Sequence, residues 1–195
     1  MVYNIGEKIK NNGFSTILIM CAIRTIEHLS VKDLMCLCYL SDRYRFLHSQ
    51  ETEPIDIDNE YIHTEVGPVS IEVLHTIGYL VSIEAITLDA SGKINRGVRS
   101  MGASKIDELR TPLFPGEPAS IEEFIINLLN RYRSVNLRES LQKKVLLLPE
   151  MESTSIGEVI AFSMEKAILS LQELEPVFFD HELPNLSFEQ ILALK

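Results

Sequence analysis

The stretch of residues 30–76 constrains the fold of this chain more than any other part. It begins with apolar residues at helical spacing, continues through a polar acidic link and a short extended segment, and then reaches Gly67 and Pro68. Ser30 can cap the first helix, with Asp33 in the reciprocal position of a capping box. Gly67 and Pro68 predict a turn that leads into a second helix. The stretch therefore predicts a long helix, a strand, a turn and another helix.

Two motifs within this stretch carry a resemblance to a known family. The first is the helical run Leu37-Cys38-Tyr39-Leu40-Ser41-Asp42. The second is Gly67-Pro68-Val69-Ser70-Ile71-Glu72-Val73, in which Ser70 opens the next helix. The order and spacing of the two motifs resemble the Panacea domain, the SocA-like antitoxin domain that is also met as a phage-associated protein family. The resemblance extends over residues 17–160.

The resemblance implies an antitoxin that binds and neutralises a cognate toxin protein. In this family neutralisation is by direct binding or, in SocA-like members, by presentation of the toxin to the ClpXP protease, and both modes stay open here. Residues in or beside the two motifs form the candidate partner-binding set: Tyr39, Asp42, Arg43, Gly67, Pro68 and Val69.

A hydrogen bond from Asp42 into the Gly67-Pro68 turn could hold the two motifs together. Such a bond would act as a packing lock, or it would shape a groove where a partner docks. The two interpretations are compatible, and the sequence leaves both open.

Length and charge fit a single domain with a terminal extension. The chain has 195 residues, of which 46% are hydrophobic, and a net charge of −10, which suits one core and an ordinary surface. Its 18 Lys and Arg would have to gather in one patch to overcome phosphate repulsion, so we do not expect a nucleic-acid partner. The acidic balance instead favours a basic protein partner, attracted by electrostatic steering. No apolar stretch approaches the ~20 residues of a membrane span, so we expect no membrane partner.

The expected fold is α+β and predominantly α-helical, with one domain over residues 1–174 and a C-terminal arm over residues 175–195. Residues 81–88 and 93–95 predict a β-hairpin around a Gly-containing turn, and we expect this hairpin to form a small antiparallel sheet with residues 61–64. Further helices are predicted over residues 15–28 (capped by Ser15 or Thr16), 101–109, 120–133 and 136–148, and from Ser155, with Glu158 as its capping partner.

The candidate chemical groups form no recognised catalytic or metal-binding pattern. Cys21, Cys36 and Cys38 are odd in number and lie in apolar surroundings, which predicts reduced core residues of a cytoplasmic protein. The five His include no His-x-x-x-His pair, and the chain has no Gly-x-Ser-x-Gly elbow and no Walker loop. We therefore expect no enzyme activity, no catalytic residue, no metal site and no cofactor.

Two alternative functions stay open at this stage. An unrecognised hydrolase would need His63, Glu65 or Asp42 to converge in a polar pocket, and His63 with Glu65 is the best local acid–base pair. A winged-helix-like regulator would need one basic face around the predicted hairpin, built from Lys93, Arg96, Arg99 and Arg110.

The C-terminal arm gives the first testable prediction. Its two clusters, residues 177–179 and 188–194, are too apolar for a solvated tail, and short helices need a surface to pack on. That surface belongs to the protein's own body, to a neighbouring subunit of a homo-oligomer or to the toxin. If the arm crosses a protein–protein interface, deletion from Pro176 onward lowers the oligomeric state or abolishes partner binding, while sedimentation and thermal melting show a folded domain. Unfolding of the truncated chain, or unchanged assembly and binding, would contradict this hypothesis.

Overall fold

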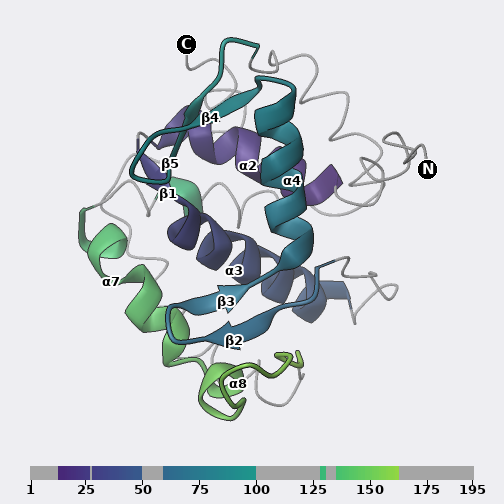
Figure 1. Cartoon of the computed structure of the whole chain (residues 1–195). Helices are drawn as coiled ribbons and strands as arrows, with labels where there is room; N and C mark the ends of the chain where they lie inside the picture. Colours follow the sequence, from purple (N-terminus) through teal and green to yellow (C-terminus); the bar gives the residue numbers. More distant parts are fainter. Residues whose placement is uncertain (1–12, 27, 50–58, 100–127, 131–134, 163–195) are drawn as a thin grey trace, which may run out of the picture.

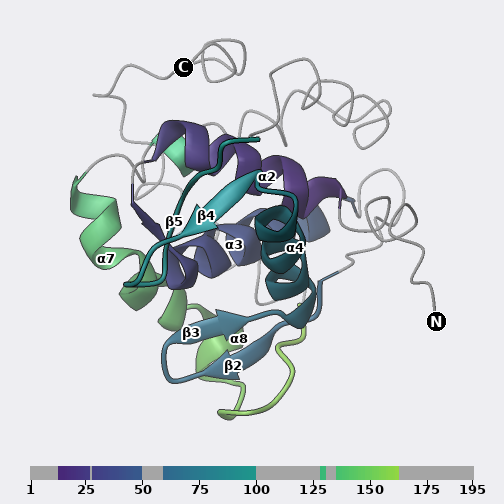
Figure 2. The ribbon, with the colours of Figure 1, turned by 45° about the horizontal axis from the view of Figure 1, so that its top comes forward.

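The fold is α+β, with helices packed around two small antiparallel sheets (Figure 1). The computed structural model describes residues 13–26, 28–49, 59–99, 128–130 and 135–162. Figure 1 places one sheet at the upper end of the molecule and the other at the lower end, with helix α3 between them. Figure 2 shows the same separation of the two sheets from a second direction. The mixed, antiparallel architecture that the sequence predicts is confirmed.

Helices α2 (Gly13–Thr25) and α3 (Val31–Ser49) pack together at the centre. Residues 18–23 of α2 are all buried, as their uninterrupted apolar run predicts. Helix α3 begins at the predicted capping pair: the Ser30 hydroxyl accepts the Asp33 backbone N–H at 3.1 Å and donates to the Asp33 carboxylate at 2.7 Å. This arrangement satisfies one of the donors that a helix start leaves without a partner.

Helix α4 (Ile71–Ser82) confirms the second helix of the 30–76 stretch. Its N-cap is Ser70, whose hydroxyl accepts the Val73 backbone N–H at 3.4 Å. One face of α4 is buried, through Val73, Thr76, Ile77 and Leu80.

The first sheet has the strand order β1–β5–β4, formed by β1 (Leu29–Ser30), β5 (Lys93–Arg96) and β4 (Ile86–Leu88). The predicted hairpin is therefore confirmed as β4–β5, although residues 81–82 belong to α4. The predicted pairing of this hairpin with residues 61–64 is wrong, because β5 pairs instead with β1 in the register Leu29↔Ile94. The side chains of Leu29, Ile86 and Ile94 are all buried, and their common burial favours this pairing.

The second sheet contains β2 (Ile62–Thr64) and β3 (Gly67–Val69), paired in the register Ile62↔Val69 and Thr64↔Gly67. The predicted turn at Gly67 and Pro68 lies two residues too late. The chain reverses at residues 65–66, and Gly67 begins β3 with a φ of +115°. Glycine is required at this exit from the turn because L side chains rarely adopt that backbone conformation.

The predicted helix from Ser155 is wrong for residues 155–162. These residues follow α7 (Val135–Leu146), which confirms the predicted helix over 136–148, and the short α8 (Pro149–Glu152). Residues 157–160 run along β2 as a third strand-like segment. The His63 N–H donates to the Glu158 carbonyl at 2.9 Å, and the Ile160 N–H donates to the Tyr61 carbonyl at 2.7 Å. Pairing with β2 satisfies backbone groups on the edge of the hairpin, and this non-local pairing replaces the helix.

Several predicted elements lie outside the described residues. Residues 128–130 are helical as predicted, with Leu128 and Leu129 buried, while the rest of the predicted helix over 120–133 lies outside. The predicted helix over 101–109 and the arm over 175–195 also lie outside the described part of the chain.

The φ of Gly67 gives a stability prediction. A Cβ at this position would meet only Cys36 Sγ, at 3.6 Å, so space is available and the cost of Gly67→Val is backbone strain. We expect the free energy of unfolding to fall by about 1–3 kcal/mol, measured by urea titration. The matched control is Gly78→Ala in α4, where a Cβ meets nothing within 4 Å and helix propensity should raise stability by up to about 1 kcal/mol. Equal effects of the two substitutions would contradict the prediction.

Candidate functional site

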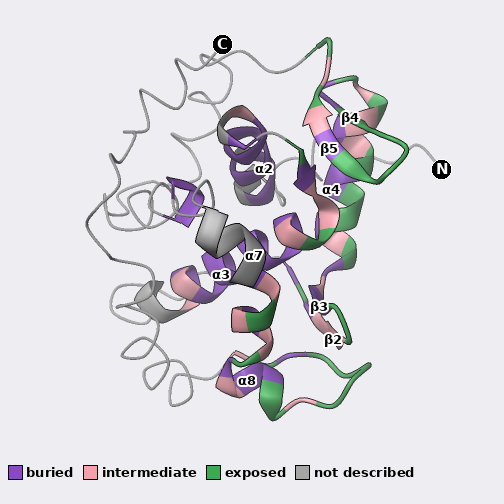
Figure 3. Cartoon of the chain, turned by 90° about the vertical axis from the view of Figure 1, so that its left-hand side faces the viewer, coloured by how far each residue is buried: buried purple, intermediate pink, exposed green. Residues whose placement is uncertain are grey.

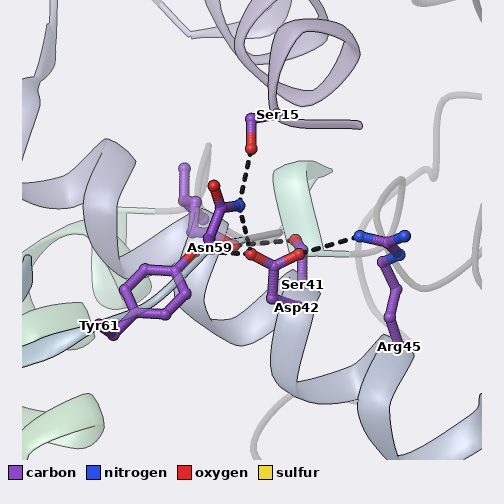
Figure 4. A network of polar contacts seen from close by, with 7 residues as sticks. Ser15, Ser41, Asp42, Arg45, Asn59 and Tyr61 are labelled. Atoms are coloured by element: carbon purple, nitrogen blue, oxygen red, sulfur yellow. Dashed lines mark hydrogen bonds and ion pairs between the residues drawn. The ribbon is translucent and has the colours of Figure 1, made fainter. Parts of the chain in front are cut away.

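A buried polar cluster lies where α2, α3 and the chain before β2 meet (Figure 4). The Asp42 carboxylate accepts hydrogen bonds from the Asn59 amide at 2.6 Å and from the Tyr61 hydroxyl at 2.8 Å, both on Oδ2. Its Oδ1 forms an ion pair with Arg45 at 3.1 Å. The same Asn59 amide donates to the Ser15 hydroxyl at 2.8 Å. We call these five residues the Asp42 cluster. Ser15, predicted as a helix cap, lies inside α2 and serves this cluster instead.

A second buried group joins α3 to α8. The Glu150 carboxylate oxygen Oε1 accepts the Tyr39 hydroxyl at 3.0 Å and forms an ion pair with the guanidinium of Arg43. Tyr39, Arg43 and Glu150 are each at most 3% exposed. Tyr39, Asp42, Arg43 and Phe46 stand at helical spacing, so one face of α3 supplies both buried groups.

Aromatic rings pack over this face of α3. The Phe162 ring is stacked against Tyr39 and Phe46, with centroid distances of 5.4 and 5.6 Å. Tyr39 and Tyr61 meet edge to face at 5.1 Å, a geometry that aromatic pairs favour. Phe162, at the end of the segment paired with β2, thus covers the polar groups and keeps water from them.

Burial controls the electrostatics of the site. Loss of hydration raises the pKa of Asp42, while Arg45, Asn59 and Tyr61 act in the opposite direction by stabilising the carboxylate. Burial likewise raises the pKa of Tyr61 and of Tyr39, and the neighbouring carboxylates Asp42 and Glu150 add to the two shifts. The hydroxyls therefore stay protonated and donate to the carboxylates. This arrangement stabilises a fixed packing of elements and leaves the charged groups inaccessible to an outside molecule.

The candidate partner-binding residues are mostly in the interior. Tyr39, Asp42, Arg43, Gly67 and Pro68 are buried, and Val69 is half-buried. Helix α3 does contact β3, so the two motifs lie together as expected. The hydrogen bond predicted from Asp42 into the Gly67-Pro68 turn is wrong, because the donors to Asp42 are those of the Asp42 cluster. In this conformation Val69 is the one member of the set with a partly exposed side chain.

Four residues of the site escaped the sequence interpretation: Arg45, Asn59, Tyr61 and Glu150. Glu150 had a usable signal, since it follows the apolar run Leu146-Leu147-Leu148-Pro149 and precedes Met151, surroundings that predict a buried and therefore paired carboxylate. Asn59 stands at the end of the acidic link and has no local signal. Tyr61 was expected in an extended segment, and its hydroxyl partner is not local in sequence.

The three side chains of the hydrolase alternative lie in different surroundings. Nδ1 of His63 donates to the Thr154 carbonyl at 2.6 Å, Glu65 is exposed in the β2–β3 turn, and Asp42 is fully buried. Among the hydrogen bonds and ion pairs of the described residues, none joins any two of these three side chains.

The basic residues of the winged-helix alternative share their surface with acids. Lys93, Arg96 and Arg99 are exposed, and Arg99 forms an ion pair with Glu84 at 3.2 Å. Asp89, also exposed, accepts the Lys93 backbone N–H at 3.0 Å in the turn beside them. Arg110 lies outside the described residues.

Within the ranges that the structure describes, no three His, Cys, Asp or Glu side chains are grouped so as to hold a metal ion. The described helices also include none with the length and apolar character needed to cross a membrane.

The buried ionisable groups predict a loss of stability in alkali. Burial, with the nearby Asp33 carboxylate, raises the pKa of Cys36 to about 12, and burial also raises the pKa of Cys38, Tyr39 and Tyr61. Each group binds its proton more firmly in the folded chain, so its stabilising contribution is complete at neutral pH. That contribution is lost as the pH rises above the ordinary pKa of the group, about 8.5 for a thiol and about 10 for a tyrosine hydroxyl, toward the folded value.

We therefore expect the free energy of unfolding, from urea titrations, to fall from about pH 9 upward with a slope near 1.4 kcal/mol per pH unit for each group. Cys36→Ala removes one of these groups. Between pH 9 and 12 the free energy of unfolding of this variant should therefore fall less steeply, by the contribution of one group. The same variant compared at pH 7 gives the pH-independent cost of lost packing. Parallel curves for the two proteins over the whole range would contradict the prediction.

The fold and the site were compared with known proteins in three ways. No family model, no curated protein and no solved structure matches the chain. The resemblance to the Panacea domain, carried by residues 37–42 and 67–73, therefore stays a prediction.

Proposed function

We propose that this protein is an antitoxin-type interaction domain that binds and neutralises a cognate toxin protein. The observation that carries the proposal is the packing of the two resemblance motifs into one unit. Helix α3 contains residues 37–42 and lies against β3, which begins the second motif, and Gly67 approaches the Cys36 thiol. Motifs separated by the acidic link in sequence are thereby joined in space.

The state of the ionisable side chains also supports a binding role. The carboxylates of Asp42 and Glu150 and the hydroxyls of Tyr39 and Tyr61 are bonded to one another or to arginines inside the protein. Groups engaged in this way stabilise a scaffold, and a rigid scaffold is suited to binding a partner protein. The acidic net charge of −10 favours a basic toxin.

The proposal leaves the mode of neutralisation open between two mechanisms. Direct binding would mask the active surface of the toxin. Alternatively, the chain would act as an adaptor that presents the toxin to a ClpXP-type protease. The two mechanisms differ in whether the toxin persists after neutralisation.

A co-expression experiment tests the proposal. Each open reading frame adjacent to the gene is induced separately in a bacterial host, with and without this chain. We expect growth arrest by the flanking product alone and growth when both are made. Repetition in a host that lacks ClpXP separates the mechanisms: continued rescue indicates direct binding, and loss of rescue with accumulation of the toxin indicates an adaptor.

The test variant for rescue is Gly67→Val, which strains the junction between the two motifs, and its matched control is Gly78→Ala. Gly67→Val should rescue less well than Gly78→Ala at equal expression. If no flanking product is toxic, or if a toxic product is not neutralised by this chain, the proposal is wrong.

A further inference from the structure

The β2–β3 hairpin and residues 157–160 form a three-stranded surface with two different faces. The inner face packs on α3 through Tyr61, Pro68 and Ile160, which are buried. Side chains of directly paired residues point to the same face of a sheet. The pairs Ile62↔Val69 and Ile62↔Val159 therefore place Val69, Ile62 and Val159 in one row across the outer face.

This outer face is apolar and open to solvent. Ile62 and Val69 are half-buried, and Val159 is 50% exposed. The surface continues from β3 onto the first turn of α4, where Ile71 and Leu74 are 52% and 42% exposed. We call these five residues the outer apolar face. Figure 3 shows exposed residues in the β2–β3 turn and along the segment after α8.

Exposed apolar residues are concentrated here rather than scattered. Of the eight exposed large apolar side chains in the described part of the chain, five lie within residues 66–74 and 156–159: Val66, Ile71, Leu74, Ile156 and Val159. Exposed apolar side chains gathered on neighbouring segments mark interaction sites on proteins.

The segments that build the outer apolar face carry acidic side chains and no Lys or Arg. These segments are residues 59–82 and 147–162. Glu60, Glu65 and Glu158 are exposed, and Glu72 is half-buried in the first turn of α4. Glu60 is exposed two residues before β2 begins. Helix α7, which contacts β3, carries Lys143 and Lys144.

We propose that the outer apolar face docks a basic partner segment, in which apolar side chains alternate with Lys or Arg. The apolar residues of that segment would cover Val159, Ile62 and Val69, and its cations would be attracted by the acidic residues of the surrounding segments, Glu60, Glu65 and Glu158. Charge complementarity of this kind selects the partner and speeds its association. The inference rests on the proposed function in one respect: the toxin is the expected source of the segment.

A defined probe tests the face independently of the toxin. The probe is a synthetic peptide of alternating Lys and Val, and its control is a peptide of alternating Glu and Val. Binding to the full-length chain is followed by fluorescence anisotropy and by amide chemical shifts. We expect the basic peptide to bind more tightly than the acidic one, to perturb residues 62, 69, 71, 74 and 159, and to weaken with added salt.

Two variants locate the binding. Val159→Lys and Glu60→Lys should each lower the affinity for the basic peptide by about tenfold or more. The matched control is Val98→Lys, which adds the same charge to a valine that is 95% exposed near the other sheet and should bind as the parent does. Circular dichroism and melting confirm that each variant is folded; because Glu60 is exposed, Glu60→Lys still tests the face if Val159→Lys unfolds.

The other occupants of the face are outcomes that overturn the inference. A dimer seen by sedimentation and abolished by Val159→Lys would make the occupant a second copy of the chain. A nitroxide at Val159→Cys that broadens amides elsewhere in the same molecule would make it the chain's own segment. Equal binding of the two peptides would also overturn it.

Toxin rescue separates this inference from the proposed function. If the parent chain, Val159→Lys and Glu60→Lys all neutralise the toxin equally well, the inference about the outer apolar face is wrong and the proposed function stands. If the parent chain neutralises no flanking product but the peptides bind as expected, the proposed function is wrong and the inference about the outer apolar face stands.

Discussion

The buried Asp42 carboxylate is the constraint on which the rest of the structure depends. An ionised carboxylate without partners inside a protein costs several kcal/mol, so burial of Asp42 is tolerated only with donors on both oxygens. Arg45 comes from the same helix, but Asn59 and Tyr61 come from the chain that leads into β2. Ser15 of α2 joins the cluster because its hydroxyl accepts a hydrogen bond from the Asn59 amide. The position of one charge on α3 thus determines where α2 lies and where β2 begins.

Glu150 extends the same constraint to the second half of the chain. Its pairing with Arg43 and Tyr39 holds α8 against α3, and residues 157–160 then reach the free edge of β2. Phe162 follows directly and stacks on Tyr39 and Phe46. The second sheet is therefore attached to α3 by its inner face, through polar and aromatic contacts together. Its outer face has no role in this attachment and is left to the surface.

Local signals in the sequence predicted local structure, and non-local structure escaped them. Ser30 and Ser70 cap helices as predicted because their partners lie three residues away. The β4–β5 hairpin formed around its turn for the same reason. By contrast, Ser155 and Glu158 do make a capping contact, at 3.3 Å, yet no helix follows them. Backbone pairing with β2 decides that region, and its partner lies about ninety residues earlier, beyond the reach of any local pattern. The pairing of β1 with β5 was missed for the same reason.

Under the proposed function, the separation between interior and surface charge would let the domain combine a fixed fold with selective binding. Asp42 and Glu150 oppose Arg43 and Arg45, so the four buried charges cancel and the net charge of −10 is carried by the other residues. The segments that build the outer apolar face contain acidic residues but no Lys or Arg to offset their negative charge. Substitutions there change the electrostatic attraction for a partner without removing a donor from Asp42 or Glu150. Partner choice can therefore vary at this face at little cost in stability, whereas a change in the Asp42 cluster disturbs every element that meets it.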